Sequence, residues 1–264
     1  MVISLWKKIV FAIATVMLIT GLVFLLFPPI SNWIGQNIAN SETEKFDNSV
    51  ANAKKGSYAD ALKNKDIDKD GYSINENGER TSDFPVLFKD DLDRLYKDSI
   101  AYNKSIINNQ GTVTTSDYST PALNMSSYGV PSGLYGYLSA PTIGMKLPIY
   151  LGANASSMSY GAAHLTNTSL PIGGESTNCA IAGHTGYIGR IFFDNLRGLA
   201  IGDKVILTNY WGSLNYCVTK TKVVKKNQTE DIYIEEGKDL LTLVTCISNN
   251  SGGFDRFIVI CERV

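Results

Sequence analysis

The chain has 264 residues, 44% of them apolar, and a formal net charge of −1. This length is enough for one or two domains with a sizeable core. A near-neutral chain offers no strongly basic surface to phosphates, so we expect no nucleic-acid partner.

An uncharged apolar stretch near the N-terminus predicts a membrane anchor. As a helix, residues 9–27 extend about 28 Å, close to the hydrocarbon thickness of a bilayer. A cleaved signal peptide is the alternative. Such a peptide has a shorter apolar region and a small-residue cleavage site. In this chain the apolar stretch is followed by Pro28 and Pro29, and no such cleavage site comes after them. Two lysines before the stretch predict a cytoplasmic tail at residues 1–8 and a single-pass protein of the cell membrane with its remainder outside.

Two segments of different character follow the anchor. Residues 28–88 are dominated by Asn, Lys, Asp, Glu and Ser, which predicts a polar, mobile stalk with room for a short helix. Residues 89–107 repeat apolar side chains every three or four positions, which predicts an amphipathic helix packed on the next domain. Residues 108–132 are rich in Asn, Thr, Ser and Gly and are expected to form a loop.

The stalk contains one pattern typical of metal-binding loops. Asp66, Asp68 and Asp70 alternate and are followed by a glycine, like the start of an EF-hand calcium loop. The twelfth position is Asn77 rather than glutamate, and tandem aspartates also occur in plain polar loops. The two interpretations are a calcium site and a solvated loop; no cofactor is required.

Residues 133–264 have the pattern of a β domain. Apolar and β-branched runs between turn signals occur near 134–140, 146–151, 178–184, 203–210, 213–224, 240–246 and 256–263. Many strands at short spacing favour a barrel or a sandwich. Of the four cysteines, Cys179, Cys217 and Cys261 lie within these runs and are expected as buried thiols, with a Cys217–Cys261 disulfide as the alternative.

Three chemically active side chains lie at the ends of predicted strands. The run LTLVTC ends on Cys246, and Arg256 opens the next run ten residues later. Upstream, the run CAIAG ends on His184. A cysteine nucleophile needs a nearby base or cation, and an acyl-transfer intermediate needs positive charge for its oxyanion. The sequence therefore offers one candidate for each role.

These residues resemble the sortase family of cysteine transpeptidases. TLVTC is similar to the family's TLxTC signature around the nucleophile, AGHTG to the stretch around the catalytic histidine, and Arg256 to the active-site arginine. The resemblance covers roughly residues 133–264. The flanking sequences are most similar to those of class C, the pilus-assembling sortases. These sequences are LPIYLG, HLTNTSLPIGG and FDNLRGLAIGDKV.

The resemblance implies a mainly β fold, a closed eight-stranded sortase-type barrel after the helical segment and the transmembrane helix. It implies catalytic roles for Cys246, His184 and Arg256. It also suggests auxiliary or substrate-binding roles for His164 and Thr245, although a structural role for His164 is an equal alternative. Class C further implies a lid, which we place within residues 89–132.

The implied reaction is cleavage of an LPxTG-like sorting signal in a secreted protein through a thioacyl intermediate. The acceptor amine is a pilin lysine if class C holds, or a peptidoglycan precursor in a housekeeping sortase. Two other classes remain open on the residues alone. One is a secreted cysteine peptidase that uses water as acceptor, and the other is a non-enzymatic anchored adhesin with a calcium loop.

Overall fold

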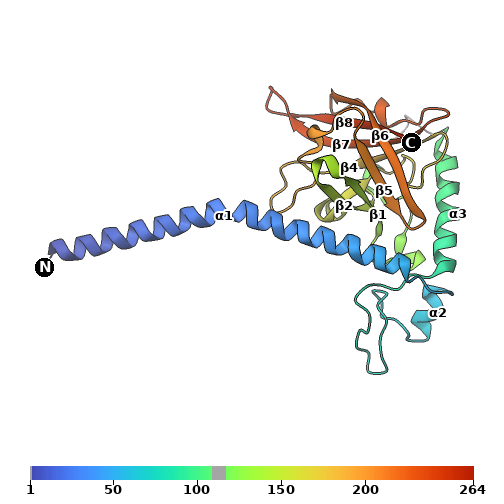
Figure 1. The fold of residues 1–264 in the computed structure, drawn as a ribbon, viewed down its shortest axis with the longest axis horizontal. Helices are drawn as coiled ribbons and strands as arrows, with labels where there is room; N and C mark the ends of the chain where they lie inside the picture. Colours follow the sequence, from blue (N-terminus) through green and yellow to red (C-terminus); the bar gives the residue numbers. More distant parts are fainter. Residues whose placement is uncertain (1, 109–116) are drawn as a thin grey trace.

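The computed structural model describes residues 2–108 and 117–264. Eight strands close into a barrel, in the order β1-β2-β3-β4-β7-β8-β6-β5. Figure 1 shows the barrel lying beside the second half of a long N-terminal helix, α1. The predicted closed eight-stranded barrel is confirmed. Its strands are β1 (Leu134–Ala140), β2 (Met145–Leu151), β3 (Ala162–His164), β4 (Thr177–Ala182), β5 (Lys204–Asn209), β6 (Gly212–Val224), β7 (Asp239–Ser248) and β8 (Phe254–Arg263).

The alternating pattern of the strands builds the barrel interior. On β7, Leu241 and Leu243 point into the main apolar cluster, together with Ile181 of β4 and Val259 of β8. The intervening residues of β7, such as Val244, therefore face outward, because successive side chains of a strand point to opposite faces. Two pairings, β2 with β3 and β4 with β7, are parallel, and the others are antiparallel.

Strand β3 was not predicted from the sequence because it has only three residues. It follows α4 (Ala155–Tyr160), a short helix that connects β2 to β3 and makes their parallel pairing possible. A run of two alanines and a histidine is too short to show the alternation from which the longer strands were predicted. Its backbone nevertheless closes the barrel between β2 and β4.

The helix α1 (Val2–Ala51) continues through Pro28 and Pro29, past the predicted end of the membrane anchor at residue 27. Ala39, Thr43, Phe46 and Ser49 are buried, so one face of its second half packs on the body of the protein. The spacing of three and four residues marks a helix face. The prediction of a mobile stalk from residue 28 is therefore wrong for this segment, because a single narrow stripe gives a weak average hydrophobicity.

The rest of the predicted stalk is also ordered. It contains the short helix α2 (Tyr58–Lys63) and a small apolar cluster made by Ala61, Ile67, Val86 and Phe88. Helix α3 (Lys89–Ile106) follows, close to its predicted limits. It is fastened to the barrel by the Asn103 side chain, whose oxygen accepts from the Leu170 amide at 2.7 Å. Short 3-10 helices, η1 to η5, occupy Asp117–Ser119, Met125–Tyr128, Pro141–Ile143, Leu196–Gly198 and Glu230–Ile232.

Within the described part of the chain, α1 is the one helix long and apolar enough to cross a membrane. The apolar side chains of its first half are exposed, from Trp6 to Phe27. Figure 1 shows this half projecting away from the barrel. Its length and composition agree with the predicted anchor.

Candidate active site

The strand register brings Cys246 and Arg256 directly opposite each other. They are partners across the antiparallel pair β7–β8. Partners of this kind have Cα atoms about 4.5 to 5.5 Å apart and side chains on the same face of the sheet. Both side chains are partly exposed. A thiol and a guanidinium therefore share one surface.

His184 reaches the same level from the other side of β7. Ala182 on β4 is paired with Val244 on β7, and the Gly183 amide donates to the Val244 carbonyl at 3.1 Å. Because the two strands are parallel, two further residues along each lead to His184 and Cys246. Neighbouring strands are about 4.8 Å apart. Cys246 on β7, Arg256 on β8 and His184, two residues past the end of β4, therefore lie at one end of the barrel.

Thr245 fixes the position of the histidine segment from the interior face. Its hydroxyl donates to the Gly183 carbonyl at 2.7 Å and lies 2.6 Å from the hydroxyl of Thr185. Both contacts flank His184. Thr245 is buried, with 3% of its surface exposed, so its position suits it to hold the backbone rather than to touch substrate.

The loop after His184 is closed by Asp194. One carboxylate oxygen accepts from the Gly186 amide at 2.7 Å and the other from the Phe192 amide at 3.0 Å. The imidazole of His184 stacks on Tyr187 with ring centroids 5.3 Å apart. The residues 184–194 therefore form a compact unit, which we call the His184 loop. The stacking of Tyr187 gave no signal in the sequence.

The turn between β7 and β8 is equally well bonded. The Asn249 side-chain oxygen accepts from the amides of Ser251 and Gly253 at 3.1 and 2.9 Å. Asp255 accepts from Lys225 at 3.0 Å, and this bond lowers the pKa of the Asp255 carboxyl. Cys246 and Arg256 thus stand at the base of a rigid turn, and a rigid support is what a preorganised site requires.

The structure does not bring His164 to this site. Its partner on β4 is Ile181, which faces the barrel interior, whereas Cys246 faces outward. The ring is fully buried, and Nε2 lies 3.2 and 3.1 Å from the carbonyl oxygens of Thr168 and Ser169. The geometry supports the structural alternative for His164 and not a contact with substrate.

The burial of His164 predicts that the stability of the fold depends on pH. Burial lowers the pKa of the imidazole to about 4, so the folded chain binds a proton at His164 less readily than the unfolded chain does. Stability should therefore fall as the pH drops from about 6.5 to about 4, by roughly 3 kcal/mol. Urea unfolding of residues 30–264 across this range measures the loss. A His164→Gln variant should show a shallower slope there, and an unchanged slope would contradict the assignment.

In the loop considered as a calcium site, an arginine side chain of the same chain pairs with the aspartates. The guanidinium of Arg80 lies 2.6 Å from Asp68 and 2.5 Å from Asp70. The second oxygen of Asp68 accepts the amides of Asp70 and Tyr72. Over residues 2–108 and 117–264, no group of three His, Cys, Asp or Glu side chains is placed to hold a metal. The calcium interpretation of Asp66, Asp68 and Asp70 is therefore not supported, because arginine already neutralises two of the carboxylates.

All four cysteines are free thiols, so the alternative of a Cys217–Cys261 disulfide is wrong. Cys179 and Cys261 are buried, and burial raises the pKa of the Cys261 thiol to about 12. A buried thiol that resists ionisation is a poor nucleophile. Cys246 differs from both because it lies at a strand end beside a cation and an imidazole.

Comparison with known proteins identifies the family. A model of the family described as "Sortase domain" matches residues 138–264. The solved structure of sortase C1 from Streptococcus agalactiae, in complex with MTSET, is 30% identical with a TM-score of 0.59. The match covers 67% of this chain and 90% of that one. The chain belongs to the sortase family.

This sortase is similar to further members of the family. A pilus-related sortase C of Group B Streptococcus is 31% identical, with a TM-score of 0.56 over 67% of this chain and 91% of that chain. Sortase D of Bacillus subtilis (strain 168) is 29% identical over 58% of this chain and 75% of that protein. Sortases are cysteine transpeptidases, so this chain is an acyl-transfer enzyme.

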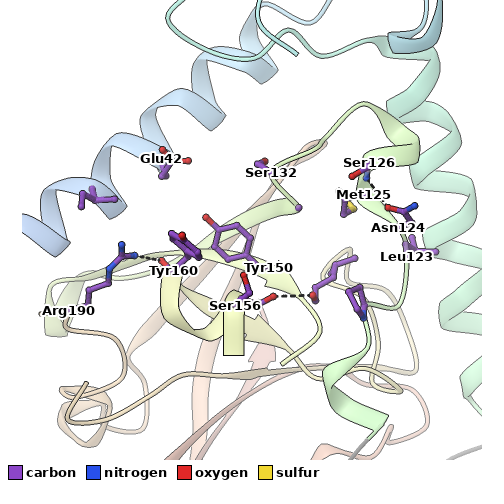
Figure 2. Close-up of a pocket in the computed structure, with 15 residues that line it drawn as sticks. Glu42, Leu123, Asn124, Met125, Ser126, Ser132, Tyr150, Ser156, Tyr160 and Arg190 are labelled. Atoms are coloured by element: carbon purple, nitrogen blue, oxygen red, sulfur yellow. Dashed lines mark hydrogen bonds between the residues drawn. The ribbon is translucent and has the colours of Figure 1, made fainter. Parts of the chain in front are cut away.

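A cavity separate from the three candidate residues lies beneath α1 of the sortase. Figure 2 shows it between α1, the segment of Leu123 to Ser126 and the barrel. Its volume is about 690 Å³, and Glu42, Tyr150, Tyr160 and Arg190 are among its lining residues. Arg190 belongs to the His184 loop and donates to the Tyr160 carbonyl at 3.1 Å. The His184 loop therefore reaches from the candidate site to the underside of α1.

Proposed function

We propose that Cys246 is the nucleophile of this sortase, His184 its acid and base, and Arg256 its oxyanion-binding group. The observation that carries this assignment is the alignment of Cys246 on β7 with Arg256 on β8 and with His184, which follows the end of β4. The Cys246 thiolate attacks a peptide carbonyl carbon, and Arg256 stabilises the negative oxygen. The peptide C–N bond breaks as His184 gives a proton to the leaving amine, and a thioester remains. A second amine then attacks the thioester and passes its proton to His184, while the thiolate leaves.

The proposed donor is an LPxTG-like sorting signal in another secreted protein. An apolar surface supports this class of substrate. Ala180, Ala182 and Val244 lie on the outward face of β4 and β7, next to Leu165 and Ile232. They precede His184 and Cys246 along the same two strands, so an apolar peptide segment bound there would lead directly to the thiol.

The proposed acceptor is a lysine of a pilin subunit, as in class C. The support is the similarity to solved sortases C, one of which is described as pilus-related. We also propose that α1 anchors the enzyme in the cell membrane with the barrel outside. A peptidoglycan amine and water are the competing acceptors, and they give different products.

The experiment is a product analysis with residues 30–264 and an LPxTG-type peptide, in which a lysine-bearing pilin peptide and a peptidoglycan-type amine compete as acceptors. Mass spectrometry should detect a thioacyl adduct on the protein and an amide joined to the lysine. An amide formed only with a peptidoglycan-type amine would overturn the pilin acceptor. Free acid as the sole product would mean that water is the acceptor and would overturn the proposed transpeptidation.

The segment 108–124 is the proposed lid. Residues 109–116 of this segment lie outside the described part of the chain. Tyr118 packs against the apolar cluster of Leu165, Ala180 and Ile232, which Ala182 and Val244 also adjoin. Its carbonyl accepts from the Ala153 amide at 2.8 Å. Tyr118 thus covers a surface that we assign to the sorting signal.

A Tyr118→Ala variant should therefore turn over a short sorting peptide faster than the parent, mainly through a lower KM. Deleting residues 108–124 should have the same direction of effect. The matched control is Tyr96→Ala, which removes an exposed tyrosine of α3 whose ring lies tilted against Trp211. Unchanged or slower turnover in both lid variants would count against the lid.

A further inference from the structure

The His184 loop touches α1 close to the end of its apolar run. A Cβ atom built on Gly35 would lie 2.3 Å from the Gly189 carbonyl oxygen and 2.7 Å from Cγ of Arg190. A Cβ atom on Gly189 would lie 3.8 Å from Cβ of Ser31. The backbone of the His184 loop at Gly189 therefore packs closely against the α1 backbone at Gly35, and the loop contacts the helix between Ser31 and Gly35.

The position of this contact along α1 sets its height above a membrane. Ser31 follows Phe27, the last residue of the predicted membrane span, by four positions, which is about 6 Å along a helix. The headgroup layer extends roughly 5 to 7 Å beyond the hydrocarbon on each side of a bilayer. The part of the loop next to Ser31 is thus at headgroup level when residues 9–27 span the hydrocarbon.

Exposed apolar side chains occur at this level on both segments. Ile188, at the tip of the His184 loop, is 80% exposed. On α1, Ile30 and Trp33 are 52% and 67% exposed, and tryptophan is enriched at membrane interfaces. An isoleucine on a loop tied by Asp194 stays exposed in water at a cost, which insertion into a lipid interface removes.

The active-site end of the barrel faces the same way. The turn that joins β7 to β8 points to the side on which the apolar half of α1 leaves the body (Figure 1). Phe254, at the end of this turn, is 59% exposed. Two apolar tips therefore flank the end of the barrel that carries Cys246 and His184.

We propose that the active-site end of the barrel rests on the membrane surface, with Ile188 of the His184 loop inserted in the phospholipid headgroup layer beside Ser31. The proposal rests on the proposed anchoring by α1. Because Tyr187 precedes Ile188 and stacks on His184, lipid contact at the tip holds the imidazole close to the bilayer. The enzyme is then placed to act on sorting signals that lie near the membrane surface.

The test is lipid quenching of a fluorophore in the full chain. The background carries Cys246→Ala and Cys217→Ser, which leaves the two buried cysteines, and an NBD label is attached through Ile188→Cys. The protein is reconstituted in vesicles of equal phosphatidylglycerol and phosphatidylcholine that contain lipids with a nitroxide at the headgroup or along the acyl chain. Far-UV circular dichroism verifies the fold of each labelled chain.

Two further label sites give the reference values. Gly21→Cys lies in the apolar run, where an added side chain meets nothing within 4 Å. Val264→Cys matches Ile188 in exposure, at 71%, but lies at the opposite end of β8 from Arg256.

We expect the headgroup nitroxide to quench the label at position 188 several times more strongly than the label at position 264. Equal, weak quenching at 188 and 264, with strong acyl-chain quenching at 21, would overturn the membrane contact while leaving the anchor in place. Weak quenching at all three sites would overturn the anchor itself, and with it the contact. Neither readout depends on catalysis, so failure of the proposed chemistry is distinguishable from both.

Discussion

Cys246→Ala should abolish both the thioacyl adduct and the amide product. The nucleophile and its base act as a unit, so we expect a loss of at least about 10⁴-fold in kcat. Cys246→Ser should be almost as inactive, because a serine hydroxyl is a much weaker nucleophile than a thiol. Substrate binding should remain, because the apolar surface of β4 and β7 is unchanged.

A matched thiol makes this prediction specific. Cys217 on β6 is partly exposed like Cys246, and its partner on β8 is Glu262, six residues from Arg256. Cys217→Ser should therefore retain parental kcat and KM. Mass spectrometry of intact protein after peptide addition reads the adduct directly, and an adduct that persists in Cys246→Ala would reassign the nucleophile.

The positions of the candidate residues were largely predictable because the residues lie close to strand ends. A run of apolar, β-branched residues that stops at Cys246, and another that stops before His184, already place both side chains at the edge of a sheet. Pairing of β4 with β7 was beyond the pattern, since a parallel pair joins segments more than fifty residues apart. Because that pairing was not predicted, the hydrogen bonds of Thr245 with Gly183 and Thr185, on either side of His184, were not predicted either.

The expectations that failed depended on packing that the local pattern does not show. The resemblance suggested His164 as an auxiliary residue, yet its ring is buried, with Nε2 beside the carbonyl oxygens of Thr168 and Ser169. The aspartates of the expected calcium loop are neutralised by Arg80, which comes ten residues after Asp70. The second half of α1 looked like a stalk because the barrel that covers its narrow apolar face begins more than eighty residues later.

Arg256→Ala should reduce kcat/KM by about 10²- to 10³-fold, the typical loss on removal of one oxyanion donor. Arg256→Lys should not restore the activity. The ammonium keeps the charge, but it has neither the planar fork nor the fixed direction of the guanidinium donors. A charge effect alone would instead make the lysine variant nearly as active as the parent.

The split between binding and chemistry decides how Arg256 acts. An oxyanion-binding group contributes mainly in the transition state, so kcat should carry most of the loss and KM should change little. Arg263, on the same strand, contacts Asn215 and Tyr216 rather than the site. Arg263→Ala is therefore the matched control and should keep its kcat. If Arg256→Ala raised KM alone, the guanidinium would be a substrate-binding group, and the negative oxygen would need another donor at the outward face of β7 and β8.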